Sequence, residues 1–174
     1  MTPDALQPSA VAALLHSAAA VIHAELSALP APALGFHPAE GEWCAKEVLG
    51  HLIECEKRGF SGRIHVIMQT EGSPQLEGWD QDAVARARKD CEREWPALYD
   101  EFSKLLSASV AQVGGLSPAD LSRRGQHPKV GALTVADLLH EWVHHDRNHI
   151  RQMLANVQAF AWPHMGNAQR FSAP

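Results

Sequence analysis

The stretch Leu138-Leu-His-Glu-Trp-Val-His-His-Asp-Arg-Asn-His-Ile-Arg-Gln152 holds four of the chain's eleven histidines within ten positions. They form two overlapping His-x-x-x-His pairs, His140/His144 and His145/His149. Residues four apart on a helix lie on one face, about 6 Å from each other. Zinc and similar ions accept imidazole nitrogen at about 2.0–2.1 Å, so either pair could bind one metal ion with ordinary rotamers.

The two pairs differ in the helix face that they share. His145 and His149 lie at three- and four-residue spacing from large apolar residues, so we expect them to point into the core. His140 and His144 share the neighbouring stripe with two arginines. An unpaired buried polar group costs about 1–3 kcal/mol, and a metal ion would provide a partner for both inward imidazoles. The apolar residues on that face are Leu138, Trp142 and Met153.

A third ligand has to come from another segment. His51 lies beside Val48 and Leu52 in the first half of a second predicted helix, so we expect it to face the core. The predicted metal ligands are therefore His51, His145 and His149. The predicted cofactor is a divalent transition metal, and Zn, Ni, Fe and Mn all remain open because each accepts imidazole.

Apolar residues at helical spacing predict four helices in one domain over residues 1–174, and little of the chain favours strands. Thr134 followed by Asp137 resembles a capping box at the start of the last helix. Inward side chains of such helices can build metal sites, so we expect an all-α four-helix bundle with long connecting loops. The predicted helices span about 9–29, 43–70, 80–113 and 134–160.

Several segments should be irregular. Prolines and glycines predict a loop over 30–41 and a long loop with one short turn over 116–133. Pro96 predicts a kink or interruption near residues 92–95 of the third helix. The charged run 86–94 alternates in sign and is typical of a solvated face. We expect the tail after Pro163 to be an irregular strap or disordered.

The composition argues against several classes of protein. A chain of 174 residues with 45% hydrophobic residues fits one core, and a net charge of −5 argues against binding to nucleic acid. The odd, widely spaced cysteines Cys44, Cys55 and Cys91 do not suggest a disulfide framework, so we expect a cytoplasmic protein. The apolar run Val11 to Ile22 contains His16 and Ser17, and we expect no membrane span.

Several motifs resemble, in order, those of the DinB/YfiT-like family of metal-binding four-helix bundles. They are Trp43, then Lys46-Glu-Val-Leu-Gly-His-Leu52, and finally His145-Asp-Arg-Asn-His-Ile-Arg-Gln152. The segments Gly125-Gln-His-Pro128 and Gly131-Ala-Leu-Thr-Val135 also match loops that the family tends to show. The resemblance covers most of the chain and places the family's metal ligands on His51, His145 and His149. The resemblance also implies an activity of the kind found in the family, which includes thiol-cofactor-dependent transferases and isomerases. Many members of the family have no known activity.

Two functional classes follow from a three-histidine site. An open site favours a metal-dependent enzyme, either a transferase that activates a low-molecular-weight thiol or a hydrolase that activates water. Cys55 lies four residues after His51 and could close the site as a fourth ligand. The metal would then stabilise a non-catalytic or stress-associated bundle. The expected partners are a small-molecule substrate or a low-molecular-weight thiol. A homodimer is a further hypothesis.

Two further expectations concern ionisation. Cys44 stands where family members often have Ser or Thr before the second helix, and a helix N-terminus can lower the pKa of a thiol. We nevertheless expect Cys44 to be passive. Metal ligation needs neutral imidazole, whose pKa is ordinarily about 6.5, so we expect metal release below about pH 6.

Overall fold

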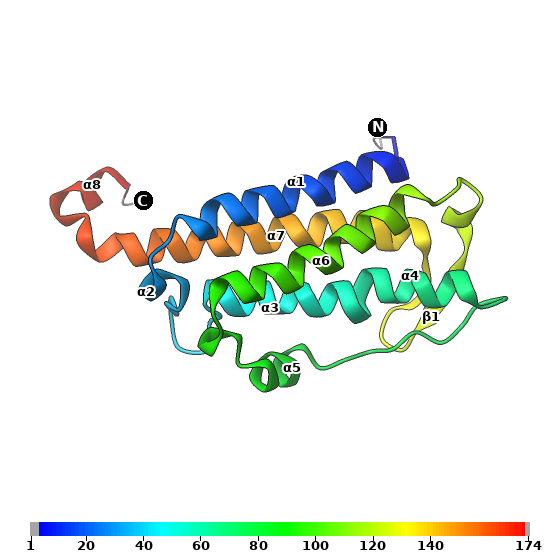
Figure 1. Cartoon of the computed structure of the whole chain (residues 1–174), viewed down its shortest axis with the longest axis horizontal. Coiled ribbons are helices and arrows are strands. Elements are labelled where there is room, and N and C mark those ends of the chain that lie inside the picture. Colours follow the sequence, from blue (N-terminus) through cyan, green and yellow to red (C-terminus); the bar gives the residue numbers. More distant parts are fainter. Residues whose placement is uncertain (1–3, 173–174) are drawn as a thin grey trace.

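Four long helical segments pack side by side in the computed structural model, which describes residues 4–172 (Figure 1). The α1 helix packs against α6 and α7, and α3 packs against the same two helices. The all-α four-helix bundle predicted from the sequence is therefore confirmed. Three of the segments are the single helices α1 (Pro8–Ser27), α6 (Trp95–Gly114) and α7 (Val135–Ala161). The remaining segment, second in the chain, consists of α3 (Ala45–Glu54), η1 (Cys55–Gly59) and α4 (Phe60–Gln69), which follow one another without a break.

The first helix, α1, agrees closely with the predicted span 9–29, and it is strongly apolar. It runs through His16 and Ser17 without a break, and an 18-residue window within it has a mean hydropathy of 1.4. By length and composition alone it could cross a bilayer. A core helix of a bundle meets the same test, and the apolar side of α1 is buried while the helix packs on α6 and α7.

The second helix contains a π-helical turn, η1, which ends at Gly59 and is followed closely by Gly62. The Phe60 N–H donates to the Cys55 carbonyl five residues earlier, which is the π-helical pattern. A Cβ atom at Gly62 would overlap the Lys57 carbonyl oxygen, so the turn requires a residue without a side chain there. The helix thus continues from Ala45 to Gln69 with one wide turn in its middle.

The predicted helix over 80–113 is wrong, because the structure divides it into three pieces. These are the short helix α5 (Gln81–Arg88), the 3₁₀ turn η2 (Asp90–Glu92) and the long helix α6. Lys89 ends α5 in the left-handed conformation with a φ of 52°. Of the two outcomes predicted from Pro96 near residues 92–95, the interruption is observed and the kink is not. Pro96 lies in the first turn of α6, where its missing N–H costs nothing.

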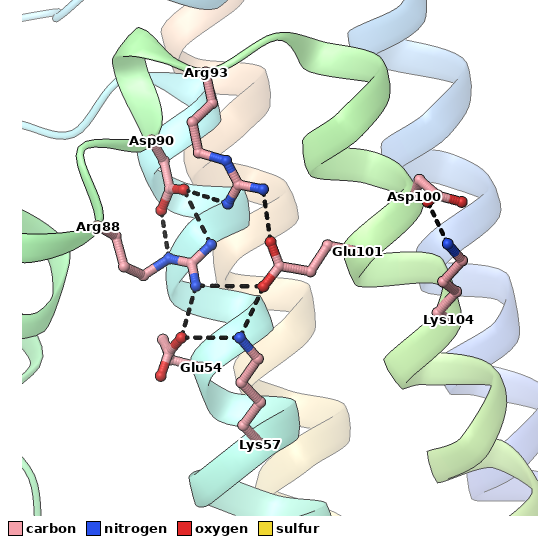
Figure 2. Close-up of polar contacts among 8 residues, drawn as sticks. All are labelled: Glu54, Lys57, Arg88, Asp90, Arg93, Asp100, Glu101 and Lys104. Atoms are coloured by element: carbon pink, nitrogen blue, oxygen red, sulfur yellow. Dashed lines mark hydrogen bonds and ion pairs between the residues drawn. The ribbon is translucent and has the colours of Figure 1, made fainter.

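The sequence suggested that the charged run 86–94 is a solvated face, but this holds only in part, because Arg88, Asp90 and Arg93 are half-buried or buried. Asp90 is only 1% exposed, and the Arg88 guanidinium donates to it with Nε···Oδ2 at 2.6 Å. Arg88 also donates to Glu54 on α3, with Nη1···Oε1 at 2.6 Å. Figure 2 shows the resulting ion-pair network, which joins α3, η1, η2 and α6. Its remaining members are Lys57, Arg93 and Glu101.

The long loop predicted over 116–133 contains a β-hairpin. Strands β1 (Arg124–His127) and β2 (Gly131–Thr134) are antiparallel, and a 3₁₀ turn, η3 (Asp120–Ser122), precedes them. The Leu76 N–H donates to the Gln126 carbonyl at 2.8 Å, so the segment before α5 lies alongside β1. After β2, Thr134 and Asp137 exchange hydrogen bonds of 2.9 and 3.0 Å, which confirms the predicted capping box of α7.

Two segments expected to be irregular contain short helices. The loop over 30–41 includes the four-residue helix α2 (Ala31–Leu34). The tail includes two 3₁₀ turns, η4 (Trp162–His164) and η5 (Gly166–Ala168), and then α8 (Gln169–Ser172). The prediction of an irregular tail is therefore wrong for these residues. Pro163 lies in the first turn of η4, so it marks a change of helix type and not the end of helical structure.

Candidate metal centre

His51, His145 and His149 meet between two helices of the bundle. One ring nitrogen from each lies within 4.8 Å of the other two. His51 extends from α3 and is 4% exposed, whereas His145 and His149 lie one turn apart on α7 and are half-buried. The structure thus brings together the three residues that the sequence nominated as ligands.

The three imidazoles are neutral at neutral pH. Burial lowers the pKa of His51 to about 3, and the nearby His149 and His145 imidazoles lower it as well. Burial also lowers the pKa of His145 to about 4 and that of His149 to about 4. Neutral imidazole is the form that coordinates a metal ion, so these side chains need not lose protons before binding one.

The ring nitrogens are arranged for a shared cation. His149 Nδ1 donates to Gln152 Oε1 at 2.9 Å, which leaves Nε2 of His149 free to coordinate. The Nε2 atoms of His51 and His145 are 3.0 Å apart, so a proton or a cation has to separate their lone pairs. Tetrahedral zinc would hold such atoms about 3.3 Å apart. The donor set therefore fits a divalent transition metal with little movement.

Cys55 lies beside this cluster but not at its centre. Its Sγ is 3.4 Å from His51 Nε2 and 3.6 Å from His145 Nε2, and the side chain is buried. Burial raises the pKa of the Cys55 thiol, and the charges of Asp146 and Glu56 raise it further. In the metal-free chain the thiol is therefore protonated.

The second His-x-x-x-His pair does not converge. His140 Nδ1 donates to the Ala136 carbonyl at 2.7 Å, and its Nε2 accepts from the Leu6 N–H at 3.0 Å. Its Nε2 thus ties the segment before α1 to α7, and its Nδ1 is engaged within α7. His144 is exposed and contacts Asn148, with Nε2···Nδ2 at 2.9 Å.

The comparisons with known proteins agree with this architecture. The family model described as the DinB superfamily matches residues 14–153, which is most of the chain. The chain belongs to the DinB superfamily. The matched region contains all three clustered histidines of this DinB protein.

Two relatives are informative. A protein of Oceanobacillus iheyensis, named as a candidate metal-dependent hydrolase, is 23% identical over 132 residues, covering 70% of this DinB chain and 69% of that protein. YfiT from Bacillus subtilis is described as a probable metal-dependent hydrolase with an unusual four-helix bundle topology. The two folds superpose with a TM-score of 0.81 at 16% identity, covering 93% of this chain and 94% of YfiT.

Two hollows adjoin the histidines of this DinB chain. A small one of about 240 Å³ is lined in part by Trp43, His149 and Gln152, so it reaches one of the clustered imidazoles. A larger pocket of about 770 Å³ has Phe60 and Trp79 in its lining. The same two aromatic rings contact the histidines. The ring centroid of Phe60 is 5.1 Å from that of His145, and the ring centroid of Trp79 is 5.8 Å from that of His51. They form the wall between the large pocket and the cluster.

Sequence reasoning missed two buried carboxyl groups next to the cluster. Glu56 and Asp146 are 4% and 3% exposed, and burial raises their pKa values to about 8 and about 7. The Ser109 hydroxyl donates to Glu56. A signal was present, because Asp146 lies four residues after Trp142 in the apolar stripe of α7, where a solvated carboxylate would not be expected.

Proposed function

We propose that this protein is a metal-dependent hydrolase that acts on a small-molecule substrate, with His51, His145 and His149 as the ligands of one divalent transition metal. The observation that carries the proposal is the convergence of three neutral, buried or half-buried imidazoles from two helices. The hydrolase names of two similar proteins support the reaction class. The ion's identity is left open among Zn, Ni, Fe and Mn.

The chain's own residues would position and shield the centre. Gln152 orients His149, and the rings of Trp43 and Trp79 lie 5.2 and 5.8 Å from His51, which keeps water from one side of the cluster. The small hollow beside His149 offers access from solvent. A bound divalent ion would supply Lewis-acid chemistry and lower the pKa of water towards about 7.

A closed structural centre is the competing function, and Cys55 is the observation that favours it. Its Sγ lies within 3.6 Å of two of the three imidazoles. If the thiolate filled the fourth position, the site would become tetrahedral and complete, as in structural zinc centres. The chain would then be a metal-stabilised bundle without a place for water.

Metal content and hydrolysis measured together test the proposal. We expect purified protein to hydrolyse members of a panel of chromogenic esters, amides and phosphoesters, to lose this activity with a chelator and to regain it with metal. His51→Ala, His145→Ala and His149→Ala should each lose the metal. The matched control is His144→Ala, on the same helix but exposed, which should keep both metal and activity.

The Cys55→Ala variant separates the alternatives. Under the hydrolase proposal it keeps the metal and the activity, because water completes the coordination. If it loses the metal, and no substrate is turned over by the unaltered chain, the closed structural centre replaces the proposal. If cobalt-loaded Cys55→Ala shows a sulfur-to-metal charge-transfer band only after a low-molecular-weight thiol is added, thiol transfer becomes the better reaction class.

A further inference from the structure

A second cluster of metal-binding side chains lies at the start of α3. One donor atom from each of four residues lies within 4.8 Å of the other three. Cys44 Sγ is 3.1 Å from Cys91 Sγ, and His37 Nε2 is 2.8 Å from Glu47 Oε2. Three of the four residues lie close together in the sequence, and Cys91 joins them from a later segment at one end of the bundle. They are His37 after α2, Cys44 and Glu47 at the start of α3, and Cys91 in η2.

The cluster has a buried side and an open side. Cys44 is completely buried and Cys91 is half-buried, whereas the His37 side chain is 45% exposed. A metal ion could therefore enter past His37 and meet the two sulfur atoms beneath it. Glu47 also accepts from the Cys44 N–H at 2.9 Å, so the carboxylate is already held in place.

We propose that His37, Cys44, Glu47 and Cys91 form a second metal site, distinct from the histidine cluster and selective for a thiophilic divalent ion such as zinc. Two sulfur donors, one imidazole and one carboxylate are a donor set that favours zinc over harder ions. With bonds of about 2.3 Å to sulfur and about 2.0 Å to nitrogen or oxygen, a tetrahedron needs donor separations of about 3.3–3.8 Å. The observed contacts have to widen by less than about 1 Å.

Protons balance simply in this step. Each thiol that becomes a thiolate releases one proton, so binding one divalent ion at Cys44 and Cys91 releases two protons, with a third from His37 if it is protonated beforehand. Burial and the contact with Cys91 raise the pKa of the Cys44 thiol, so its proton leaves only when a metal ion takes its place. Nothing is oxidised or reduced.

The consequence would be structural. The four donors join three segments: the loop after α2, the start of α3, and η2. Cys91 directly follows Asp90 of the ion-pair network, and Lys46 already donates to the Arg93 carbonyl at 2.9 Å. A bound ion would thus fix η2 against α3 by ligand bonds in addition to ion pairs. Four protein ligands would complete its coordination, as expected of a structural site.

A disulfide between Cys44 and Cys91 is the alternative that the experiment has to separate. It would require an oxidant and would leave His37 and Glu47 without a role in the cluster. It also forms only when the protein is not kept reduced. Metal binding, by contrast, needs both thiols free. The two outcomes therefore differ in their response to a reductant.

The test uses cobalt as the probe, with the full chain kept reduced by a phosphine. The Cys55→Ser variant removes the thiol beside the histidine cluster, so any sulfur-to-cobalt charge-transfer band must come from Cys44 and Cys91. We expect that band in Cys55→Ser, together with competition by zinc. Adding Cys91→Ser should abolish it and lower the metal content by one equivalent per chain. Circular dichroism checks that each variant remains folded.

A milder variant keeps the proposal testable if Cys91→Ser does not fold. His37→Ala alters an exposed residue, so it should fold, keep the sulfur band and bind cobalt more weakly. Absence of the band in reduced, folded Cys55→Ser protein would overturn the second site. So would unchanged cobalt affinity in His37→Ala. Neither result bears on the proposed hydrolase, whose metal and activity depend on His51, His145 and His149.

Discussion

At the scale of single residues, His51 is the most confined of the three clustered imidazoles. Trp43 and Trp79 lie against its ring, with centroids 5.2 and 5.8 Å away, and its Nε2 lies 3.0 Å from that of His145. A charged imidazole in this position would lose most of its hydration. The same packing that holds the ring in place therefore also keeps it unprotonated.

This confinement changes the expected pH dependence of metal binding. From the ordinary pKa of histidine, metal release was expected below about pH 6. In the folded chain, however, the pKa is lowered to about 3 for His51 and to about 4 for His145 and His149. Protons therefore begin to compete with the metal only as the pH falls towards about 4. We expect equilibrium dialysis to show metal retained at pH 5 and lost as the pH approaches 4.

The direction in which stability changes with pH follows from the linkage between proton binding and folding. Because the folded-state pKa values are depressed, the neutral imidazoles contribute stability that is fully present above about pH 6.5 and is lost as the pH falls through about 4 and then about 3. Circular dichroism at each pH is the control, since unfolding would release the metal by itself. Half-release near pH 6 from folded protein would show that the imidazoles are not buried as described.

The positions of the histidines were predictable because helical spacing alone determines the face of a helix. His145 and His149 share the face of Trp142, and that face is buried. The buried carboxyl groups were not predicted, because sequence patterns treat Glu56 and Asp146 as solvent-exposed by residue type. What makes Glu56 tolerable in the core is a hydroxyl from Ser109 on another helix, and that contact is not visible in the local sequence.

At the scale of elements, the ion-pair network attaches η2 to the second helix (Figure 2). Asp90 lies against the backbone of α3 at Gly50, where a Cβ atom would overlap its Oδ2. The glycine thus lets a buried carboxylate approach the helix closely. Arg88 then neutralises it through two contacts, at 2.6 and 3.0 Å.

The Gly50→Ala substitution should therefore destabilise the protein even though alanine is the better helix former. Expulsion of Asp90 would break its ion pairs with Arg88 and Arg93, although Arg88 would keep Glu54 as a partner. Breaking a buried ion pair costs about 3–5 kcal/mol, against about 1 kcal/mol gained in helix propensity. We expect a net loss of about 2–4 kcal/mol in the free energy of unfolding, measured with urea.

Gly114→Ala is the matched control. It lies in α6 and an added Cβ would meet no atom within 4 Å, so it should be neutral or slightly stabilising. Equal stability of the two variants would mean that Asp90 does not pack against Gly50.

The break between α5 and α6 shows where the reasoning from the sequence stopped. Periodicity continued from residue 80 to 113, and Pro96 predicted only a kink or an interruption near residues 92–95. Proline is equally suited to the first turn of a helix, so Pro96 could also mark the start of a new helix. The break before Pro96 is explained by the burial of Asp90, which is a tertiary contact. Alternating charges predict a solvated face. Here Gly50, which is distant in the sequence, leaves room for the buried Asp90 carboxylate.

At the scale of the whole molecule, the large pocket and the histidine cluster share a wall formed by Phe60 and Trp79. We extend the proposed function by assigning this pocket to the body of the substrate. The hairpin supplies its opposite side, with Ala132 of β2 among the lining residues. The bundle would then hold the metal, and the hairpin would determine which molecules reach it.

Filling the pocket tests this assignment. Ala132→Trp should raise KM by about tenfold or more for any substrate that the protein hydrolyses, because a lost pocket contact is worth about 1–3 kcal/mol. Metal content should stay at the level of the unaltered chain, as Ala132 does not touch the histidines. The control is Ala155→Trp, an exposed position on α7 outside this pocket. An unchanged KM in Ala132→Trp would place the substrate elsewhere.

The bundle itself was predictable because each long helix carries its own apolar stripe, and four such stripes have few ways to be buried together. The hairpin was not, because its strands have four residues each and contain glycine and polar residues. Its backbone pairing with Leu76 joins segments about 50 positions apart, and no local pattern encodes such a contact.

The π-helical turn η1 sets the angular relation between the two halves of its helix. An α-helix advances by about 100° per residue, and an i→i+5 turn contains one residue more than a regular turn. The wide turn absorbs that extra residue; if the same residues formed a regular α-helix instead, everything after Gly59 would be rotated by about 100° relative to His51. Phe60 would then leave the ring of His145. Loss of the wide turn at constant chain length would thus separate metal ligand from pocket wall while leaving every side chain chemically unchanged.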